Sequence, residues 1–409
     1  YKRQGGLYQN LKELRDTEGR SSCNFFRSLG LDYLYVGEGN DIPSLVAAFA
    51  KVKDTSRPTV VHIHTQKGKG YAPAEADREE FHWEMPFDLE TGKPKVDCSG
   101  MEDYHSLTGK FLLEKMKEDH TVVAISSGTP TVIGFTPERR KQAGRQFVDV
   151  GIAEEHAVAL ASGIAAGGGR PVYGVYSTFI QRCYDQLSQD LCINGNPAVI
   201  TVFMGTVAGM NDVTHLGFFD IPLISNIPNM VYLAPTCSEE YFAMLEWAVR
   251  QTEYPVAIRV PGVAVVHRKE EFDTDYSELN RYKMTARGET VAILALGSFY
   301  DLGQALKNKL REESGVEATL INPRYITGLD ELMLEELKVG HRIVVTLEDG
   351  VLDGGFGEKI ARYYGNSEMR VLNYGLRKEF ADRYNLDELM KANRLTDKQM
   401  AEDIAGILE

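Results

Sequence analysis

The sequence predicts an α/β fold made of doubly wound parallel sheets. Short apolar, β-branched runs alternate with segments of helical length along most of the chain. Nearly continuous apolar runs of this kind are typical of parallel strands that helices cover on both faces. The alternation continues without a low-complexity tract or a solenoid period, so more than one such sheet is expected. The expected strands are residues 59–64, 122–126, 146–150, 172–176, 198–203, 230–233, 256–260, 290–296, 318–322, 342–347 and 371–374.

Segments of helical length lie between these strands and carry the helical pattern of apolar residues. The clearest expected helices are residues 106–118, 154–166, 238–251, 302–313 and 329–339.

Two polar stretches, residues 77–100 and 265–288, interrupt the alternation and are interpreted as linkers. The block before the first linker offers one strand and up to two helices. That is too little for a doubly wound sheet, which suggests that a sheet has been cut. The expected domains are residues 1–84, 104–275 and 286–409, with a linker at 85–103.

Composition and charge exclude several classes of function. The chain has 409 residues and a net charge of −14, which argues against a broad nucleic-acid surface. No apolar run reaches the roughly 18 residues of a membrane span, so no membrane partner is expected. The five cysteines are odd in number and lack CxxC spacing, which indicates a reducing, cytoplasmic compartment. The first residue is Tyr1, with no initiator Met, so we expect a truncated or processed chain.

The strongest local signal for chemistry surrounds Glu154. An apolar strand ends at Gly151, and Glu154 follows just as a helix begins. Open α/β sheets place ligands at the carboxyl ends of their strands, and a helix N-terminus favours a negative charge. The alternative is an ordinary acidic residue in a first helical turn, which is common.

Two further segments carry residues suited to a binding site. Tyr176, Phe179 and Arg182 follow a strand and offer stacking surfaces and an anion contact, although they also fit the start of a helix with an aromatic core face. His215 lies in a polar loop flanked by Gly209 and Gly217, where it can transfer protons near neutral pH. As a single histidine it also fits a surface turn.

Two other patterns have simpler interpretations. His62 and His64 alternate along a strand, but no third metal ligand lies close in sequence, so a strand followed by a Gly-rich loop is preferred. Gly354 and Gly355 follow a strand without the full dinucleotide-binding fingerprint, and we interpret them as close strand-to-helix packing.

Several segments, in chain order, resemble the later two-thirds of the 1-deoxy-D-xylulose-5-phosphate synthase family. Residues 151–158 (GIAEEHAV) resemble the family's GIAEQHAV, and residues 176–186 (YSTFIQRCYDQ) resemble YSTFLQRAYDQ. These two motifs together are specific, and other transketolase-like enzymes match them less well. The similarity covers nearly the whole chain. The remaining matches are residues 25–33 with FFEELGxxY, 67–75 with KGxGYxPAE, 214–217 with THQG and 348–355 with EEN…GG.

The resemblance implies a thiamine-diphosphate-binding fold with a transketolase C-terminal domain. Residues 1–84 would then be the tail of the diphosphate-binding domain, and residues 104–275 the pyrimidine-binding domain. The reaction implied is decarboxylation of pyruvate and addition to an aldehyde, glyceraldehyde 3-phosphate in the family, by a homodimer that uses thiamine diphosphate and Mg²⁺.

The resemblance also assigns roles to individual residues. Glu154 would contact N1′ of the cofactor aminopyrimidine, and Phe179 would pack against that ring. His215 would shuttle a proton, which makes Glu154 and His215 the catalytic pair. The implied cofactor-binding residues are Tyr71, Glu154, Tyr176 and Phe179, and the implied substrate-binding residues are Tyr176, Arg182 and His215.

The chain departs from the family pattern in three places. The family's GDG…N element, which holds Mg²⁺ and the diphosphate, does not occur before residue 104, so a missing segment or a separate N-terminal subunit is expected to supply the metal ligands. Two arginines that hold the acceptor's phosphate are absent from the matching stretches 206–209 and 260–262, although Arg259 precedes the second. Each lost charge-assisted contact weakens binding by about 1.5–3 kcal/mol, so the acceptor is open.

The third departure is the family's DGHD, which appears as residues 38–41 (EGND), without its His.

Three further readings stay open. A transketolase-like ketol transferase and a protein similar to the 2-oxo-acid dehydrogenase beta subunit are alternative enzymes. A catalytically silent paralogue that acts as a partner subunit is the third, and the retained Glu154 argues against it.

Overall fold

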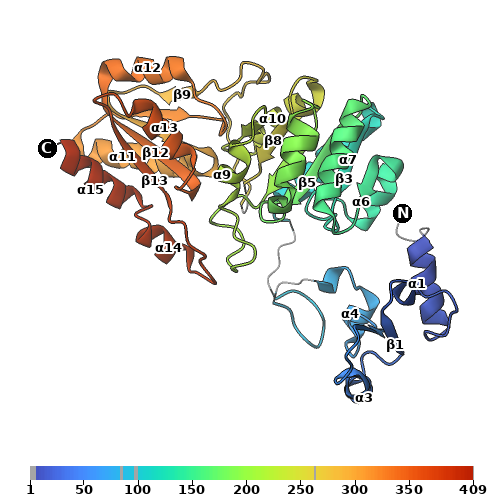
Figure 1. The fold of residues 1–409 in the computed structure, drawn as a ribbon. Helices are drawn as coiled ribbons and strands as arrows, with labels where there is room; N and C mark the ends of the chain where they lie inside the picture. Colours follow the sequence, from blue (N-terminus) through green and yellow to red (C-terminus); the bar gives the residue numbers. More distant parts are fainter. Residues whose placement is uncertain (1–5, 83–85, 96–99, 262–263, 409) are drawn as a thin grey trace. The chain divides into compact units, whose positions relative to one another are not determined.

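The computed structural model describes residues 6–82, 86–95, 100–261 and 264–408. The chain divides into two compact units, Tyr1–Met101 and Glu102–Glu409 (Figure 1). Tyr1, on which the expectation of a truncated or processed chain rests, and Gly262 of the stretch 260–262 lie outside the described residues. No helix in the described part of the chain is long and apolar enough to cross a membrane.

The first unit is built around two parallel strands. β1 (Asp32–Val36) pairs in register with β2 (Thr59–Ile63), and helix α3 (Ile42–Val52) connects them. Asp41 caps α3, because its carboxylate accepts a hydrogen bond from Ser44 N at 2.8 Å. The other helices of this unit are α1 (Gly6–Asp16), α2 (Phe25–Ser28), α4 (Ala72–Ala76) and the short η1 (Glu80–His82).

The prediction of a single strand and up to two helices in this block was wrong. Strand β2 was expected, but β1 was not, because Asp32-Tyr33-Leu34-Tyr35 lacks the continuous apolar character of a buried parallel strand. The residues of β1 are only partly buried, apart from Val36. A half-covered strand therefore carries a weaker signal than a central one.

The second unit begins with a six-stranded parallel sheet in the order β4-β3-β5-β6-β8-β7. All six strands were expected from the sequence, and central strand β6 is buried along its whole length. The strands are β3 (Val122–Ser126), β4 (Phe147–Asp149), β5 (Arg170–Tyr176), β6 (Val199–Phe203), β7 (Val231–Leu233) and β8 (Val256–Arg259). The helices are α5 (Tyr104–Glu118), α6 (Pro137–Ala143), α7 (Glu154–Ala166), α8 (Tyr184–Gln186), α9 (Asp220–Ser225) and α10 (Ser238–Arg250), with short turns η2 (Gly144–Gln146), η3 (Ile180–Cys183) and η4 (Leu187–Cys192).

A five-stranded sheet in the order β13-β12-β10-β11-β9 completes the second unit. Its pairs are parallel except β9, which runs antiparallel to β11 at the edge. The strands are β9 (Lys283–Ala286), β10 (Thr290–Ala295), β11 (Thr319–Asn322), β12 (His341–Val351) and β13 (Arg370–Leu376). The helices are α11 (Tyr300–Ser314), α12 (Glu331–Gly340), α13 (Phe356–Tyr364), α14 (Leu386–Ala392) and α15 (Asp397–Leu408), with the turn η5 (Gly297–Phe299).

The two doubly wound sheets confirm the predicted fold class. The interpretation of residues 265–288 as a linker was wrong in part, because β9 lies within it. An edge strand needs only one apolar face, so its four residues left no apolar run to detect. Tyr276 and Tyr282 are also buried there, at 2% and 5% exposure. The three domain boundaries stay a prediction.

The two sheets of the second unit share one hydrophobic core. Ile125 and Val175 of the first sheet belong to the same buried cluster as Leu294 and Val344 of the second. An isolated antiparallel bridge between Leu233 and Tyr325 joins them through the backbone. This shared core sets the position of the C-terminal sheet relative to the loops of the six-stranded sheet.

Candidate active site

The six-stranded sheet changes direction between β3 and β5. The chain places β4 on one side of β3 and then returns to place β5 on the other. Ligands of open α/β sheets bind beyond the carboxyl ends of the strands at such a switch point. The segments after β4 and β5 carry Glu154 and Tyr176, so the sheet topology brings the two strongest sequence signals to one crevice.

Glu154 is a buried carboxylate at the first position of helix α7, with 3% exposure. The turn before it is tight, because Gly151 has a φ of 79° and its N–H donates to Asp149 Oδ1 at 2.7 Å. Ala153 N–H then donates to Gly151 O at 2.8 Å. The glycine permits the left-handed turn that delivers the carboxylate to the N-terminus of α7, whose dipole favours its charge.

Arg182 is the ion-pair partner of Glu154. Its Nη1 lies 3.3 Å from Glu154 Oε2, while 57% of the arginine side chain is exposed. The short helical turn η3, directly after the β5 loop, supplies this arginine. The pair orients the Glu154 carboxylate, and it occupies the guanidinium that the resemblance assigned to substrate. A substrate role for Arg182 stays a prediction.

Aromatic rings form a connected wall beside this pair. The ring of Phe179 meets Tyr176 at a centroid distance of 5.4 Å and His215 at 5.5 Å, both edge to face. His105 adds to the wall, stacked on Phe203 at 4.8 Å and 6.3 Å from Tyr176. The structure therefore brings together Tyr176, Phe179 and His215, which lie in two separate segments of the sequence.

His105 was not anticipated from the sequence. Burial lowers the pKa of its imidazole, and Nδ1 lies 2.6 Å from the carbonyl oxygen of Val132, so Nδ1 carries the proton. His105 belongs to the first turn of α5, far from the strand ends that carry the motifs. Only the packing of α5 against the sheet brings it there, and the sequence contains no local signal for that contact.

His215 lies in the loop of residues 204–217, which we call the His215 loop. Its Nδ1 is 3.1 Å from Asp212 Oδ1 and 2.8 Å from Thr214 Oγ1. Hydrogen bonds from the Thr214 and His215 side chains lower the pKa of Asp212. Asp212 was also missed in the sequence, although a carboxylate three residues before a histidine is a recognisable pattern for orienting an imidazole.

Close backbone packing shapes the start of the His215 loop. Met204 adopts a φ of 57°, and its carbonyl oxygen accepts hydrogen bonds from Thr206 N and Ser177 Oγ at 3.0 and 3.1 Å. A Cβ at Gly217 would lie 1.8 Å from the same oxygen. Only glycine fits at 217, so this residue closes the loop against the end of β6.

Arg259 does not replace the missing phosphate-binding arginines. Its side chain is 4% exposed, and its Nε lies 2.8 Å from Asp220 Oδ2. Its Nη2 donates to the carbonyl oxygen of Asp349 at 2.5 Å, while Asp349 Oδ1 accepts from Val207 N at 2.7 Å. The guanidinium therefore belongs to a buried hydrogen-bond network that joins β8, α9 and β12. This network contacts the His215 loop through the backbone of Val207.

Tyr71 belongs to the first unit and is described within it. Its ring packs against Phe81 at 5.7 Å and Phe87 at 5.9 Å, and its hydroxyl is buried with no hydrogen-bond partner among the described residues. Its cofactor role stays a prediction. In the same unit, His62 Nδ1 lies 2.6 Å from Tyr33 Oη, so this imidazole is engaged with a tyrosine.

The glycines after β12 pack as expected. A Cβ at Gly355 would lie 2.4 Å from Glu348 Oε2, so the strand and the start of α13 meet too closely for any side chain. In the described part of the chain, no group of three or more His, Cys, Asp or Glu side chains is placed to hold a metal ion.

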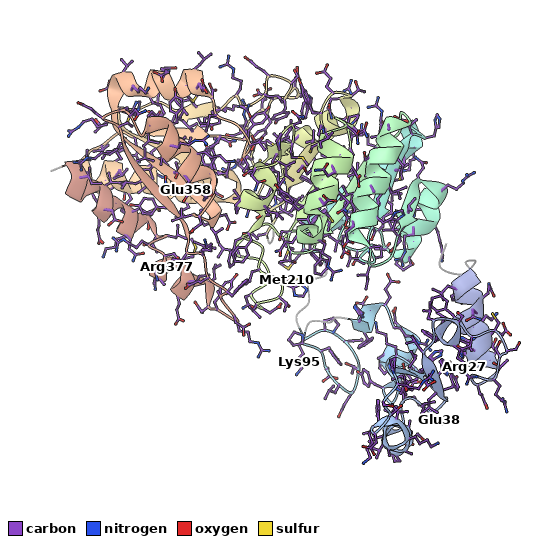
Figure 2. The ribbon with its side chains drawn as sticks, viewed as in Figure 1. Arg27, Glu38, Lys95, Met210, Glu358 and Arg377 are labelled. Atoms are coloured by element: carbon purple, nitrogen blue, oxygen red, sulfur yellow. The ribbon has the colours of Figure 1, made fainter. Side chains whose placement is uncertain are left out.

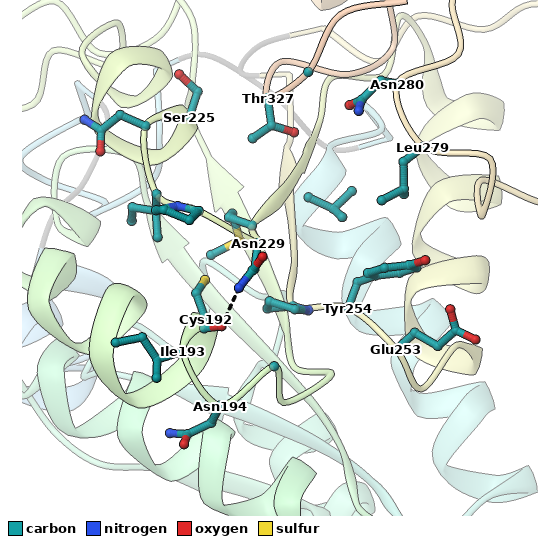
Figure 3. Close-up of a pocket in the computed structure, with 18 residues that line it drawn as sticks. Cys192, Ile193, Asn194, Ser225, Asn229, Glu253, Tyr254, Leu279, Asn280 and Thr327 are labelled. Carbon is teal, nitrogen blue, oxygen red and sulfur yellow. Dashed lines mark hydrogen bonds between the residues drawn. The ribbon is translucent and has the colours of Figure 1, made fainter.

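A cavity of about 580 Å³ lies beside the amino ends of strands β6, β7 and β8, at the end of the sheet opposite to the candidate site (Figure 3). It is lined by residues that precede strands rather than follow them, among them Asn194, Asn229 and Tyr254, together with Asn280 and Thr327. Asn229 Nδ2 donates to Cys192 O across one wall. Glu154 and His215 do not line it, so this cavity is separate from the candidate site.

Two family models match the second unit. The model described as transketolase, pyrimidine binding domain, matches residues 102–265, and the model described as transketolase, C-terminal domain, matches residues 281–400.

Curated relatives align along nearly the whole chain. The 1-deoxy-D-xylulose-5-phosphate synthase of Clostridium tetani is 33% identical over 98% of this chain and 65% of its own length. The protein of the same name from Alkaliphilus oremlandii is 35% identical over 93% of this chain and 60% of its own length. The chain thus spans less than two thirds of these relatives and aligns with their C-terminal part.

Solved structures share the fold at low identity. A chain titled split gene transketolase, inactive beta4 tetramer, has a TM-score of 0.63 and 21% identity, covering 74% of this chain and 96% of that chain. A transketolase mutant from Pichia stipitis has a TM-score of 0.60 and 15% identity, covering 93% of this chain and 67% of that chain. Both confirm the arrangement of parallel sheets described above.

Proposed function

This chain belongs to the transketolase-like family, and from that premise we propose that it decarboxylates pyruvate and joins the remaining two-carbon unit to an aldehyde. The products are carbon dioxide and a 1-deoxyketose, which is 1-deoxy-D-xylulose 5-phosphate when the acceptor is glyceraldehyde 3-phosphate. The names of the curated relatives support this choice of reaction. Thiamine diphosphate and Mg²⁺ are the proposed cofactors.

The buried carboxylate of Glu154 is the observation that carries the proposal. A carboxylate with 3% exposure needs hydrogen-bond donors for both oxygens. Arg182 serves Oε2, and no described residue donates to Oε1. A protonated ring nitrogen is a donor of the right chemistry for that oxygen, and the ring of Phe179 lies nearby to pack against a flat heterocycle. The residues present therefore fit the aminopyrimidine of thiamine diphosphate.

Each residue of the site has a proposed task in this reaction. When bound, thiamine diphosphate supplies the nucleophilic carbon and the electron sink that decarboxylation requires. Glu154 would hold a proton at the pyrimidine nitrogen, and Arg182 orients the Glu154 carboxylate through their ion pair. Asp212 orients His215, whose Nε2 then exchanges a proton with the substrate oxygen. The aromatic wall of Tyr176 and Phe179 excludes water from the reacting atoms.

The diphosphate and Mg²⁺ are proposed to bind elsewhere in the complete protein. Whole-length relatives contain residues beyond the 60–65% that this chain matches. We assign the metal ligands to that part, present either as a preceding segment or as a separate subunit. A homodimer is the proposed assembly.

The direct test uses the complete protein with pyruvate, thiamine diphosphate and Mg²⁺. Carbon dioxide release that depends on pyruvate and an aldehyde, without a ketose donor, is expected. Release of a two-carbon unit from a ketose phosphate instead would favour the transketolase-like alternative. Cofactor binding is followed separately by circular dichroism, and absence of binding with Mg²⁺ present would contradict the proposal.

A partner subunit is the second candidate function. The matched split-gene transketolase structure is described as an inactive beta4 tetramer, and it covers 74% of this chain. If this chain also requires a complement, activity will appear only when the N-terminal part is supplied. Mixing the chain with an N-terminal domain taken from a curated relative, and measuring carbon dioxide release, separates a silent partner from an incomplete enzyme.

A further inference from the structure

The C-terminal part of the second unit holds the His215 loop by direct hydrogen bonds. We define the strap as residues 377–385, which lie between β13 and α14. Arg383 N donates to Asn211 O at 2.6 Å, and Asn211 Nδ2 donates to Tyr384 O at 3.1 Å. Figure 2 labels Met210 in the loop and Arg377 at the start of the strap.

Two more bonds complete this attachment. Tyr384 Oη donates to Val207 O at 2.6 Å, and Val213 N donates to Asp382 Oδ1 at 3.2 Å. The strap therefore contacts the loop at three points before His215. The strap therefore lies directly against the loop that carries His215.

Arg383 is held in an unusual backbone conformation at this contact. Its φ is 46°, in the left-handed region that a non-glycine residue disfavours. Such a conformation persists where surrounding bonds over-determine it, and here the Asn211 and Tyr384 bonds do so. The position of Arg383 is thus set by the loop and not by its own preference.

The guanidinium of Arg383 has no ion-pair partner among the described residues, whereas Arg182, Arg259 and Lys378 each pair with a carboxylate. Arg182 pairs with Glu154, Arg259 with Asp220, and Lys378 with Asp353 at 3.0 Å. Arg383 is exposed, and no described residue pairs with its side chain. The nearby carboxylates Asp212 and Asp382 already accept hydrogen bonds from groups of the His215 loop.

We propose that Arg383 binds the anionic group of the acceptor aldehyde, and so determines specificity for a phosphorylated acceptor. The inference rests on the proposed function. The His215 loop lacks the arginines that would meet a phosphate, and Arg259 is buried in its own network. Arg383 supplies the missing charge from another part of the sequence, with a fork that matches a phosphate monoester. An aldehyde phosphorylated at its far end places its carbonyl toward His215 and its anion toward the strap.

The first test compares phosphorylated with unphosphorylated glyceraldehyde in the complete enzyme. The Arg383→Gln variant is expected to lower kcat/KM for glyceraldehyde 3-phosphate by roughly 10- to 100-fold, while kcat/KM for glyceraldehyde stays unchanged. Arg383→Lys should recover part of the loss. The matched control is Lys378→Gln, which removes one positive charge from the same strap and should change neither value. An equal loss for both aldehydes, or no loss, would overturn the proposal.

The second test does not depend on activity. Phenylglyoxal modifies accessible arginines, and mass spectrometry reads the modification of each. Glyceraldehyde 3-phosphate and inorganic phosphate should slow modification of Arg383 and leave exposed Arg145 unaffected. Equal modification of Arg383 with and without these probes would refute the proposal. A protein that protects Arg383 yet releases no carbon dioxide from pyruvate would contradict the proposed function alone.

Discussion

Each sheet of the second unit buries a glutamate where a strand leads into a helix, and the two carboxylates are held differently. Glu154 begins α7 in the pyrimidine-binding part, and one oxygen pairs with the half-exposed Arg182. Glu348 lies in β12 of the C-terminal part at 0% exposure. Its two oxygens each accept a backbone N–H at the start of α13, from Phe356 and Gly357, at 2.8 Å.

This difference separates a structural carboxylate from a candidate catalytic one. The backbone of α13 satisfies both oxygens of Glu348, which leaves nothing for a ligand to bind. Glu154 has one oxygen that no described residue serves, beside an aromatic wall at a topological switch point. Burial by itself therefore does not identify function, and what distinguishes Glu154 from Glu348 is an oxygen that no described residue binds.

The largest effect is expected from Glu154→Gln. The amide keeps the size of the side chain but cannot hold a proton at a ring nitrogen, so kcat should fall by about 10³-fold. The control is Glu155→Gln, which alters the exposed neighbour on the same helical turn and should keep activity. Steady-state carbon dioxide release measures both. Retained activity in the Glu154 variant would remove the basis for distinguishing it from Glu348.

The next effect concerns stability and pH at Glu348. Burial raises the pKa of this carboxyl from 4.5 to about 7. The folded state therefore holds the proton more tightly than the unfolded chain. Ionisation costs folding free energy that is absent below about pH 4.5, grows up to pH 7 and reaches on the order of 3 kcal/mol above it.

The glutamine of the Glu348→Gln variant cannot ionise. The unfolding free energy of the variant relative to that of the parent should therefore rise by about that amount between pH 4.5 and 8. Urea unfolding at several pH values measures the difference. The control is Glu358→Gln, whose exposed carboxylate accepts a hydrogen bond from Gly354 N at 2.8 Å. A pH-independent difference for the Glu348 variant would show that this carboxyl does not titrate in that window.

The smallest of these effects is expected from Arg182→Gln. Removing the guanidinium leaves Glu154 without its charged donor, and we expect roughly a 10-fold loss of kcat/KM for pyruvate. Arg182→Lys should restore part of it. Arg145→Gln, another exposed arginine, should have no effect. A loss confined to KM for the acceptor would instead support the substrate contact that the resemblance implied.

Sequence reasoning recovered the central strands and the principal helices because buried parallel strands carry long apolar runs. It missed β1 and β9, whose half-covered positions need few apolar residues. It singled out Glu154, Phe179 and His215 as candidates through motifs at strand ends, and the structure places Phe179 against His215. It missed His105 and Asp212, since the first contributes through the packing of α5 and the second through a turn that positions an imidazole.

The sequence by itself determined the fold class and marked the segments after β4 and β5 as candidate site segments, because both depend on local patterns repeated in chain order. Only the tertiary structure decided which charges remain available. Arg259 is buried against Asp220, Arg182 pairs with Glu154, and Arg383 reaches the His215 loop from about 170 residues away along the chain. Contacts between residues so distant in sequence leave no local pattern. The last contact forms because Val207 and Leu216 of the His215 loop pack in one buried cluster with residues of the second sheet.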